Sequence, residues 1–149
     1  MTTQEALKYI TPHHPHSLYL KELELSNLRG IDKQTQARRR KESLGIVPSL
    51  SVYEGPKYLI LDYAKWLSGD TSFEISTDEL KEEINRIFPK IIEFSPKNIA
   101  QILGISLQTV NTHRKNNSGI KASVDELGKY YFDINNLIKW MQENRVQTA

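Results

Sequence analysis

The chain has 149 residues, a formal net charge of +2 and no cysteine, and 26% of its residues are charged. This length suits one compact domain or two small ones that need no cross-links, and the lack of cysteine excludes disulfides and thiolate metal sites. Because no apolar run approaches the ~20 residues that span a bilayer and the N-terminal residues lack the pattern of a signal peptide, we expect a cytoplasmic protein that does not enter a membrane.

Residues 1–17 predict a short helix followed by a loop rich in histidine and proline. The helix runs from about residue 2 to Ile10, with Leu7 and Ile10 facing inward, and Pro12 ends it. The loop at 12–17 holds closely spaced histidines, which can indicate a metal site. Its prolines prevent a helix that would align these histidines, and no carboxylate follows nearby, so we interpret the segment as a solvated loop. We assign no metal ligand and no cofactor to the chain.

The segment 18–69 begins with two predicted helices separated by Gly30. The first spans residues 18–29, and its candidate core residues are Leu20, Leu23, Leu25 and Leu28. The second runs from about 33 to 43 and exposes a polar, cationic face. Charge runs usually face water, but on the second helix of a helix-turn-helix such a face suits contacts to phosphates and base edges. The candidate DNA contacts here are Lys33, Gln34, Thr35, Arg38, Arg39 and Lys41.

Two strand-like runs follow, at 49–53 and 57–61, on either side of the turn signal Glu54-Gly-Pro56. They predict a β-hairpin that would stand beside the two helices as a wing. Lys57, near the tip of this hairpin, is a candidate phosphate contact.

A short third helix at 62–67 completes the first unit, with Asp62 as its cap and Gly69 beyond its end. We interpret Trp66 in this helix as a core residue. The alternative is an exposed aromatic platform for stacking.

Residues 70–93 predict a linker that contains an acidic amphipathic helix. Ser76 and Glu79 have the spacing of a capping box, and the helix extends to about Phe88 before Pro89. Its apolar stripe is Leu80, Ile84, Ile87 and Phe88. Its other face holds Asp78, Glu79, Glu82 and Glu83. We expect the stripe to pack between two units and the acidic face to lie away from DNA, while a helix that binds a protein partner, within 76–92, is the alternative.

The segment 94–144 repeats the arrangement of two helices and a turn. Ser95 can cap the first helix, Gly104 can adopt the positive φ that ends it, and Ser106 can cap the second. Val110 then faces inward. Short polar and cationic side chains remain on the outer face of the second helix, where amides and hydroxyls suit base edges and cations suit phosphates. The candidate DNA contacts are Ser106, Gln108, Thr109, Asn111, Thr112, Arg114 and Lys115.

A second wing is predicted from residues 120–125 and 129–132, which flank Glu126-Leu-Gly128. Lys129 and Tyr130 are its candidate DNA contacts. Asp133 caps a last helix at 134–144, and residues 145–149 are expected to form a frayed tail.

The two helix pairs repeat at a spacing of 74 positions. This shift places Gly30 on Gly104 and Lys65-Trp66 on Lys139-Trp140, and only the wing region needs a small local adjustment. Further residues that match at this spacing are Ile31 and Ile105, Gln34 and Gln108, Thr35 and Thr109, Arg40 and Arg114, and Lys41 and Lys115. The repeat indicates an internal duplication.

The second unit, from Phe94 to Met141, resembles the winged helix-turn-helix of excisionases and the MerR superfamily. The resemblance rests on Ile99-Ala-Gln-Ile-Leu-Gly-Ile-Ser106, Thr109-Val110, Gly128-Lys-Tyr-Tyr-Phe-Asp133 and Leu137-Ile-Lys-Trp-Met141. It implies that the second helix enters the major groove and that the wing contacts the flanking backbone or minor groove. The first unit looks like a diverged copy, with Arg29 where Leu103 stands and Asp32 where Ser106 stands.

The sequence therefore predicts an α+β, mostly α protein in which two winged helix-turn-helix units form an internal pseudo-dimer, joined by an acidic linker helix. Two DNA-reading units in one chain raise affinity without new contacts. If their helices enter successive major grooves, they must lie about 34 Å apart and cover about 15–25 base pairs. Because the two outer faces differ, this site should be an imperfect repeat.

Three functions are compatible with these features. The first is a transcriptional regulator that binds double-stranded DNA, most simply a repressor acting as a monomeric pseudo-dimer. The second is an excisionase-like or other architectural accessory of a plasmid, phage or conjugative element. The third is a protein-interaction module without DNA binding. We do not expect an enzyme, because the sequence contains no phosphate-binding loop and no nucleophile motif.

Overall fold

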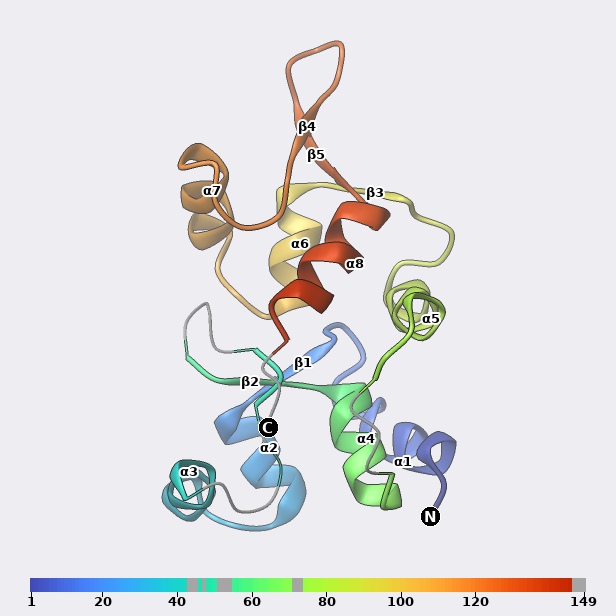
Figure 1. The fold of residues 1–149 in the computed structure, drawn as a ribbon, viewed down its shortest axis with the longest axis vertical. Helices are drawn as coiled ribbons and strands as arrows, with labels where there is room; N and C mark the ends of the chain where they lie inside the picture. Colours follow the sequence, from blue (N-terminus) through green and yellow to red (C-terminus); the bar gives the residue numbers. More distant parts are fainter. Residues whose placement is uncertain (43–45, 47, 51–54, 71–73, 146–149) are drawn as a thin grey trace. The chain divides into compact units, whose positions relative to one another are not determined.

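The structure is a computed structural model that describes residues 1–42, 46, 48–50, 55–70 and 74–145. These residues form an α+β fold that is mostly helical, as predicted, with eight helices and five short strands (Figure 1). The chain divides into two compact units. Unit 1 comprises residues 1–74 and 145–149, and unit 2 comprises residues 75–144.

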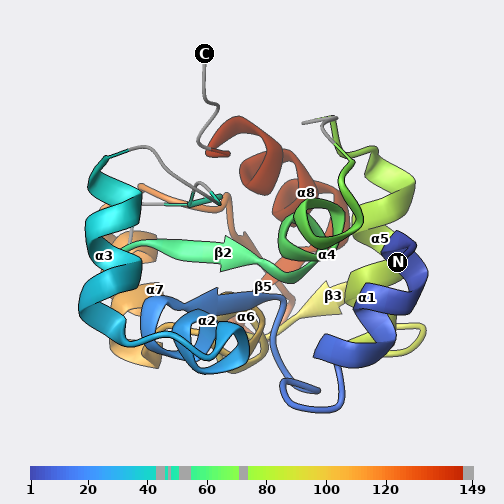
Figure 2. The same cartoon turned by 90° about the horizontal axis from the view of Figure 1, so that it is seen from below.

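The N-terminal helix α1 (Thr3–Ile10) belongs to unit 1. Thr2 caps it, and its buried residues include the predicted Leu7 and Ile10. This apolar face packs on α4 (Ile60–Ser68), as Figure 2 shows. We expected residues 1–17 to stand apart from the first unit, but a helix this short becomes stable by burying its apolar face against a neighbour.

The first strand, β1 (Tyr19–Lys21), lies where we predicted the start of a helix. Its residues pair in antiparallel fashion with β2 (Lys57–Leu59), and Leu20 lies opposite Tyr58 (Figure 2). The predicted helix begins only at Glu22. Three consecutive apolar residues at 18–20 are buried from both sides, which fits a strand better than one turn of an amphipathic helix.

The first helix pair of unit 1 consists of α2 (Glu22–Arg29) and α3 (Lys33–Lys41). Leu25 is buried as predicted, whereas Leu23 is exposed. Because α2 starts later than expected, its buried face is formed by Glu22, Leu25 and Ser26.

The predicted first wing is described only in part, since residues 51–54 lie outside the described residues. An antiparallel bridge between Leu50 and Lys57 is present. The second predicted strand is shorter than expected because α4 already begins at Ile60, with Leu59 as its N-cap.

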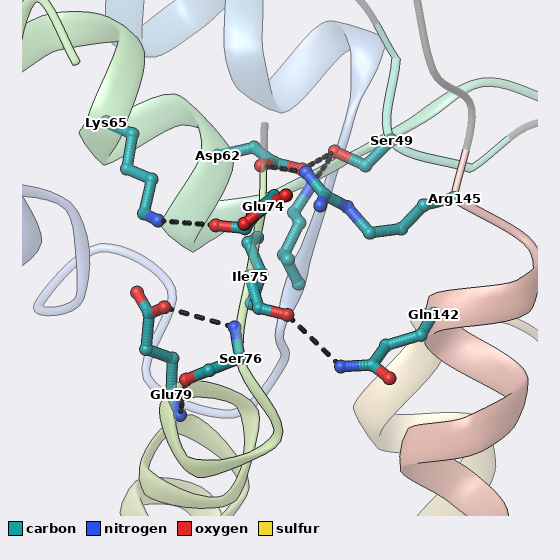
Figure 3. Close-up of polar contacts among 10 residues, drawn as sticks. Ser49, Asp62, Lys65, Glu74, Ile75, Ser76, Glu79, Gln142 and Arg145 are labelled. Carbon is teal, nitrogen blue, oxygen red and sulfur yellow. Dashed lines mark hydrogen bonds and ion pairs between the residues drawn. The ribbon is translucent and has the colours of Figure 1, made fainter. Parts of the chain in front are cut away.

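Asp62 is therefore not the helix cap that we predicted. It lies in the first turn of α4, where it accepts a hydrogen bond of 2.6 Å from the Ser49 hydroxyl and pairs with Arg145 (Figure 3). Arg145 thus belongs to unit 1 and not to a frayed tail, while residues 146–149 lie outside the described residues. Lys65, also in α4, donates to the backbone carbonyl of Glu74 at 3.1 Å.

Unit 2 begins with the acidic helix α5 (Thr77–Ile87). The predicted capping box is confirmed: the amide of Glu79 donates to the Ser76 hydroxyl, and the amide of Ser76 donates to the Glu79 carboxylate (Figure 3). The helix packs on α8 (Ile134–Glu143), and Gln142 of α8 donates to the carbonyl of Ile75 at 3.1 Å. The helix expected as a linker is therefore part of unit 2.

The remaining elements of unit 2 are a helix pair and a small sheet. The helices are α6 (Pro96–Leu103) and α7 (Leu107–Lys115). The sheet has the strand order β3-β5-β4, formed by β3 (Glu93–Phe94), β5 (Tyr130–Asp133) and β4 (Ser123–Val124). The β4–β5 hairpin is the predicted second wing, and in Figure 1 its turn projects beyond the helices of this unit.

Corresponding elements of the two units lie 74 positions apart. α6 and α7 begin and end 74 positions after α2 and α3. The strand pairs agree at the same spacing, because Tyr19 lies opposite Leu59 in unit 1 and Glu93 lies opposite Asp133 in unit 2.

The wing region is the place where this spacing changes. Leu50 faces Lys57 in unit 1, whereas Ser123 faces Tyr131 in unit 2, so the first strand of the hairpin is offset by 73 positions and the second by 74. The sequence comparison also required a local adjustment in this region, but it set Tyr58 against Tyr130, whereas the strand pairing sets Tyr58 against Phe132.

Candidate nucleic-acid interface

In each unit a left-handed glycine ends one helix and directs the chain into the next. Gly30 has φ 68° and Gly104 has φ 67°, as predicted. The amide of the residue after each glycine returns to the preceding helix: Ile31 bonds to the carbonyl of Ser26 and Ile105 to that of Ala100. This double closure of the helix end fixes the direction in which the second helix leaves.

The second helix of each unit is capped by a side chain, by Ser106 as predicted in unit 2 and by Asp32 in unit 1, where no cap was predicted. The Ser106 hydroxyl accepts from the amide of Thr109 at 3.1 Å. Asp32 accepts from the amide of Thr35 at 2.8 Å and from its hydroxyl at 3.0 Å. These hydrogen bonds, the backbone one first, lower the pKa of the Asp32 carboxyl. The cap residues and the two threonines therefore have hydrogen-bond partners within their own helices.

Helix α3 has no acidic residue and presents a dense cationic surface. Lys33, Gln34, Arg38 and Lys41 are exposed, and Thr35 and Arg39 are half-buried. Four cations lie in the last turn of α3, where they interact favourably with the negative end of the helix dipole. The face can therefore bind anions without losing helix stability.

Helix α7 has fewer cations and more amide and hydroxyl groups, and it too lacks acidic residues. The buried Val110 anchors it, as predicted. Its exposed candidates are Ser106, Gln108, Thr112 and Lys115, and its half-buried candidates are Thr109, Asn111 and Arg114.

One pair of predicted DNA contacts is brought together across two elements. The guanidinium of Arg114 lies 3.8 Å from the ring centroid of Tyr130, a residue of β5. This cation–π contact joins the last turn of α7 to the wing. The candidate contacts of α7 and those of the wing are therefore neighbours at this point of unit 2.

The tip of the second wing is held by a single carboxylate. Asp125 accepts from the amides of Leu127 and Lys129 at 2.8 and 2.9 Å, and Gly128 supplies the positive φ of the turn. Lys129 is exposed as predicted. Leu127 is 83% exposed at this tip, a feature that we did not predict from the sequence.

Lys57 is not available as a phosphate contact, contrary to the prediction. It is only 1% exposed, because β2 lies between β1 and the bridge to Leu50. A flexible cationic side chain near a turn signal usually faces water, and the pairing with β1, which buries Lys57, was not predicted.

Trp66 also differs from its prediction. It is 39% exposed, whereas Trp140, at the corresponding position of unit 2, is 6% exposed. Its ring stacks on Tyr63 with centroids 6.0 Å apart, and Arg29 lies over it at 4.9 Å. Trp66 is therefore not the fully buried core residue that we expected.

Two further polar residues of α3 have structural roles that the sequence did not reveal. Arg40 pairs with the buried Glu22 of α2 at 2.9 Å. Gln36 is fully buried and takes the place that Val110 occupies in unit 2. A helical-wheel comparison of the two repeats would have placed Gln36 inward, because its counterpart is apolar.

The loop at 12–17 has exposed His13 and His16, in keeping with a solvated segment. His14 is half-buried, and its Nδ1 lies 3.2 Å from the Glu24 carboxylate. Among the residues that the structure describes, no three acidic or histidine side chains are grouped to hold a metal ion.

None of the described helices has the length and apolarity that a bilayer crossing requires, and the longest has 11 residues.

No protein-family model, no curated protein and no solved structure matched this chain.

Proposed function

We propose that this protein binds double-stranded DNA through α3, α7 and the β4–β5 wing, and that it acts as a transcriptional regulator, most simply a repressor. The observation that carries the proposal is the pair of exposed helices without acidic residues, each held behind a capped, glycine-ended turn. Such a helix presents short polar groups to base edges and cations to phosphates.

The agreement of the two units at a 74-position spacing supports an internal duplication of one winged helix-turn-helix. Two linked reading units raise affinity, because binding of one holds the other at high local concentration. The operator is then an imperfect repeat of about 15–25 base pairs.

The proposal is tested by measuring DNA affinity as a function of salt. The probe is a fluorescent duplex chosen by selection from a random library with the full chain. Replacing Arg38 and Arg39 by alanine removes two cations of α3, and we expect both a lower affinity and a smaller salt slope, reduced by about 0.9 for each phosphate that the variant no longer neutralises.

The matched control replaces Lys8 and Lys139 by alanine, because both are exposed and lie on α1 and α8. This control changes net charge equally and should leave the slope nearly unchanged. Equal slopes for the α3 variant and the wild type would remove α3 from the interface. If the full chain selects no duplex from the random library, DNA binding itself is refuted.

A further inference from the structure

The core behind the reading helix is built differently in the two units. Unit 2 closes this region with two apolar residues, Leu103 and Val110, which are both buried. At the corresponding positions unit 1 has Arg29 and Gln36, and Gln36 is fully buried. A polar pair at a core position is costly unless its groups find partners.

The polar pair of unit 1 forms a short chain of contacts. Arg29 Nη1 donates to Gln36 Oε1 at 2.6 Å, and Gln36 Nε2 donates to the hydroxyl of Tyr58 at 3.3 Å. Burial raises the pKa of the Tyr58 hydroxyl, which keeps that hydroxyl neutral, and the hydrogen bond from Gln36 opposes the rise. Arg29, the outer member of this chain, is only half-buried and lies against Trp66.

An open pocket of about 310 Å³ lies beside Arg29, between α1, α2 and α4. Its volume is at the lower end of those that hold small organic ligands. Besides Met1, the lining comprises three aromatic residues, two leucines and one guanidinium: Tyr9, Tyr63, Trp66, Leu28, Leu67 and Arg29. None of the described lining residues is acidic, so the charge of Arg29 is not neutralised within the pocket.

We infer that unit 1 binds a planar aromatic carboxylate in this pocket. The exposed part of the Trp66 ring offers an apolar surface that the aromatic part can contact. The guanidinium fork of Arg29 can receive a carboxylate through two parallel hydrogen bonds, whereas an uncharged amide offers no such match.

The ligand acts on α3 through Gln36. A carboxylate at Arg29 competes with the Gln36 amide oxygen for the same guanidinium. Because Gln36 is the buried anchor of α3, a changed contact at this residue alters how α3 is held. The regulatory consequence, a DNA affinity that depends on the ligand, rests on the proposed function, while the binding site itself does not.

The site is tested by titrating the full chain with 2-naphthoate and, separately, with 2-naphthamide, using calorimetry without DNA. We expect 2-naphthoate to bind at least about 10-fold more tightly than the amide, because the amide cannot form the charge-assisted pair with Arg29. The side-chain amide resonance of Gln36 should shift with the carboxylate.

The decisive variant is Arg29→Leu, which installs the residue that unit 2 has at this place. It should abolish the preference for the carboxylate. Arg38→Leu is the matched control, since it removes one exposed cation from the same unit outside the pocket and should retain the preference. If Arg29→Leu does not fold, Arg29→Lys keeps the charge, loses the fork and should reduce the preference.

Binding of neither probe, equal binding of both, or an unchanged preference in the folded Arg29 variant would overturn the inference. Because calorimetry is done without DNA, failure here leaves the proposed DNA binding intact. If the full chain selects no duplex but binds 2-naphthoate, only the proposed function is refuted.

Discussion

Glu83 is a carboxylate that unit 2 holds largely away from water. It lies on α5 with 8% of its surface exposed, and its nearest cation is Arg86, one turn along, at 3.4 Å. Burial raises the pKa of the Glu83 carboxyl, and the attraction of Arg86 lowers it only in part. We predicted this residue on the solvated face of α5, because its type and its acidic neighbours suggested exposure.

The raised pKa makes the stability of the protein depend on pH. Between the ordinary and the raised value the folded state binds more protons than the unfolded state, so this group's contribution to the free energy of unfolding falls as pH rises through that range. Glu83→Gln stays neutral. The variant should therefore gain stability relative to the wild type as pH rises above the ordinary carboxyl pKa of about 4.3.

Urea denaturation of both proteins at several pH values measures this difference. Glu82→Gln is the control, because Glu82 is the exposed neighbour on the same helix. Parallel stability curves for wild type and Glu83→Gln would show that the burial of Glu83 does not perturb its titration.

At the scale of single residues, local partners were predictable and distant partners were not. The caps formed by Ser76 and Asp133 involve groups three residues away, and both were predicted correctly. The burial of Lys57 depends on a strand that starts at Tyr19, and the ring of Trp66 contacts Arg29, which lies on another helix. Sequence spacing contains no direct signal for such pairings.

At the scale of elements, the second wing is the part of the candidate interface with the most mixed chemistry. Its tip combines the exposed Leu127 and Lys129 with Asp125 and Glu126. The Asp125 carboxylate is engaged by two backbone amides, whereas Glu126 is exposed. An exposed carboxylate beside a phosphate costs binding energy, so the charge of residue 126 is a sensitive reporter of DNA proximity.

Glu126→Lys should increase DNA affinity and steepen its salt dependence, because it replaces repulsion from phosphate by attraction. The increase is measured on the selected duplex by fluorescence anisotropy. Glu143→Lys, on the exposed face of α8, is the control for the same change of charge. Equal effects of the two substitutions would indicate a general electrostatic effect and would argue against contact by the wing.

Helices were predicted better than strands in this chain. The second helix pair was evident from two caps, an apolar face and a glycine, which lie within one continuous segment, and the first pair was evident from its glycine and its match to the second. The strand β1 was assigned to a helix because Leu18, Tyr19 and Leu20 fit either period, and only pairing with β2 decides between them.

At the scale of the whole molecule, the proposed function requires both units to bind one duplex. We expect Arg38→Ala with Arg39→Ala to shorten the DNase footprint from one side, and Gln108→Ala with Lys115→Ala to shorten it from the other. Affinity for the full site should fall by about 100-fold in either variant, because the advantage of linked binding disappears.

The variant with Lys8→Ala and Lys139→Ala again serves as the control and should leave the full footprint. If either reading-helix variant lowered affinity while protecting the whole site evenly, the two units would not occupy separate halves. The division into two units and the repeat of their elements make this experiment possible, because each helix can be changed alone.

Under the proposed function, the different charges of α3 and α7 would give the protein a fixed orientation on its DNA site. Helix α3 carries a run of arginines in its last turn, whereas α7 has one arginine and one lysine there. A dimer of identical subunits can be turned end over end on its operator without consequence. A single chain with two unequal DNA-binding helices cannot be turned in this way. Inverting its site relative to a promoter would therefore exchange the flank that is bound more tightly. Such oriented binding would let one protein regulate two divergently transcribed genes differently.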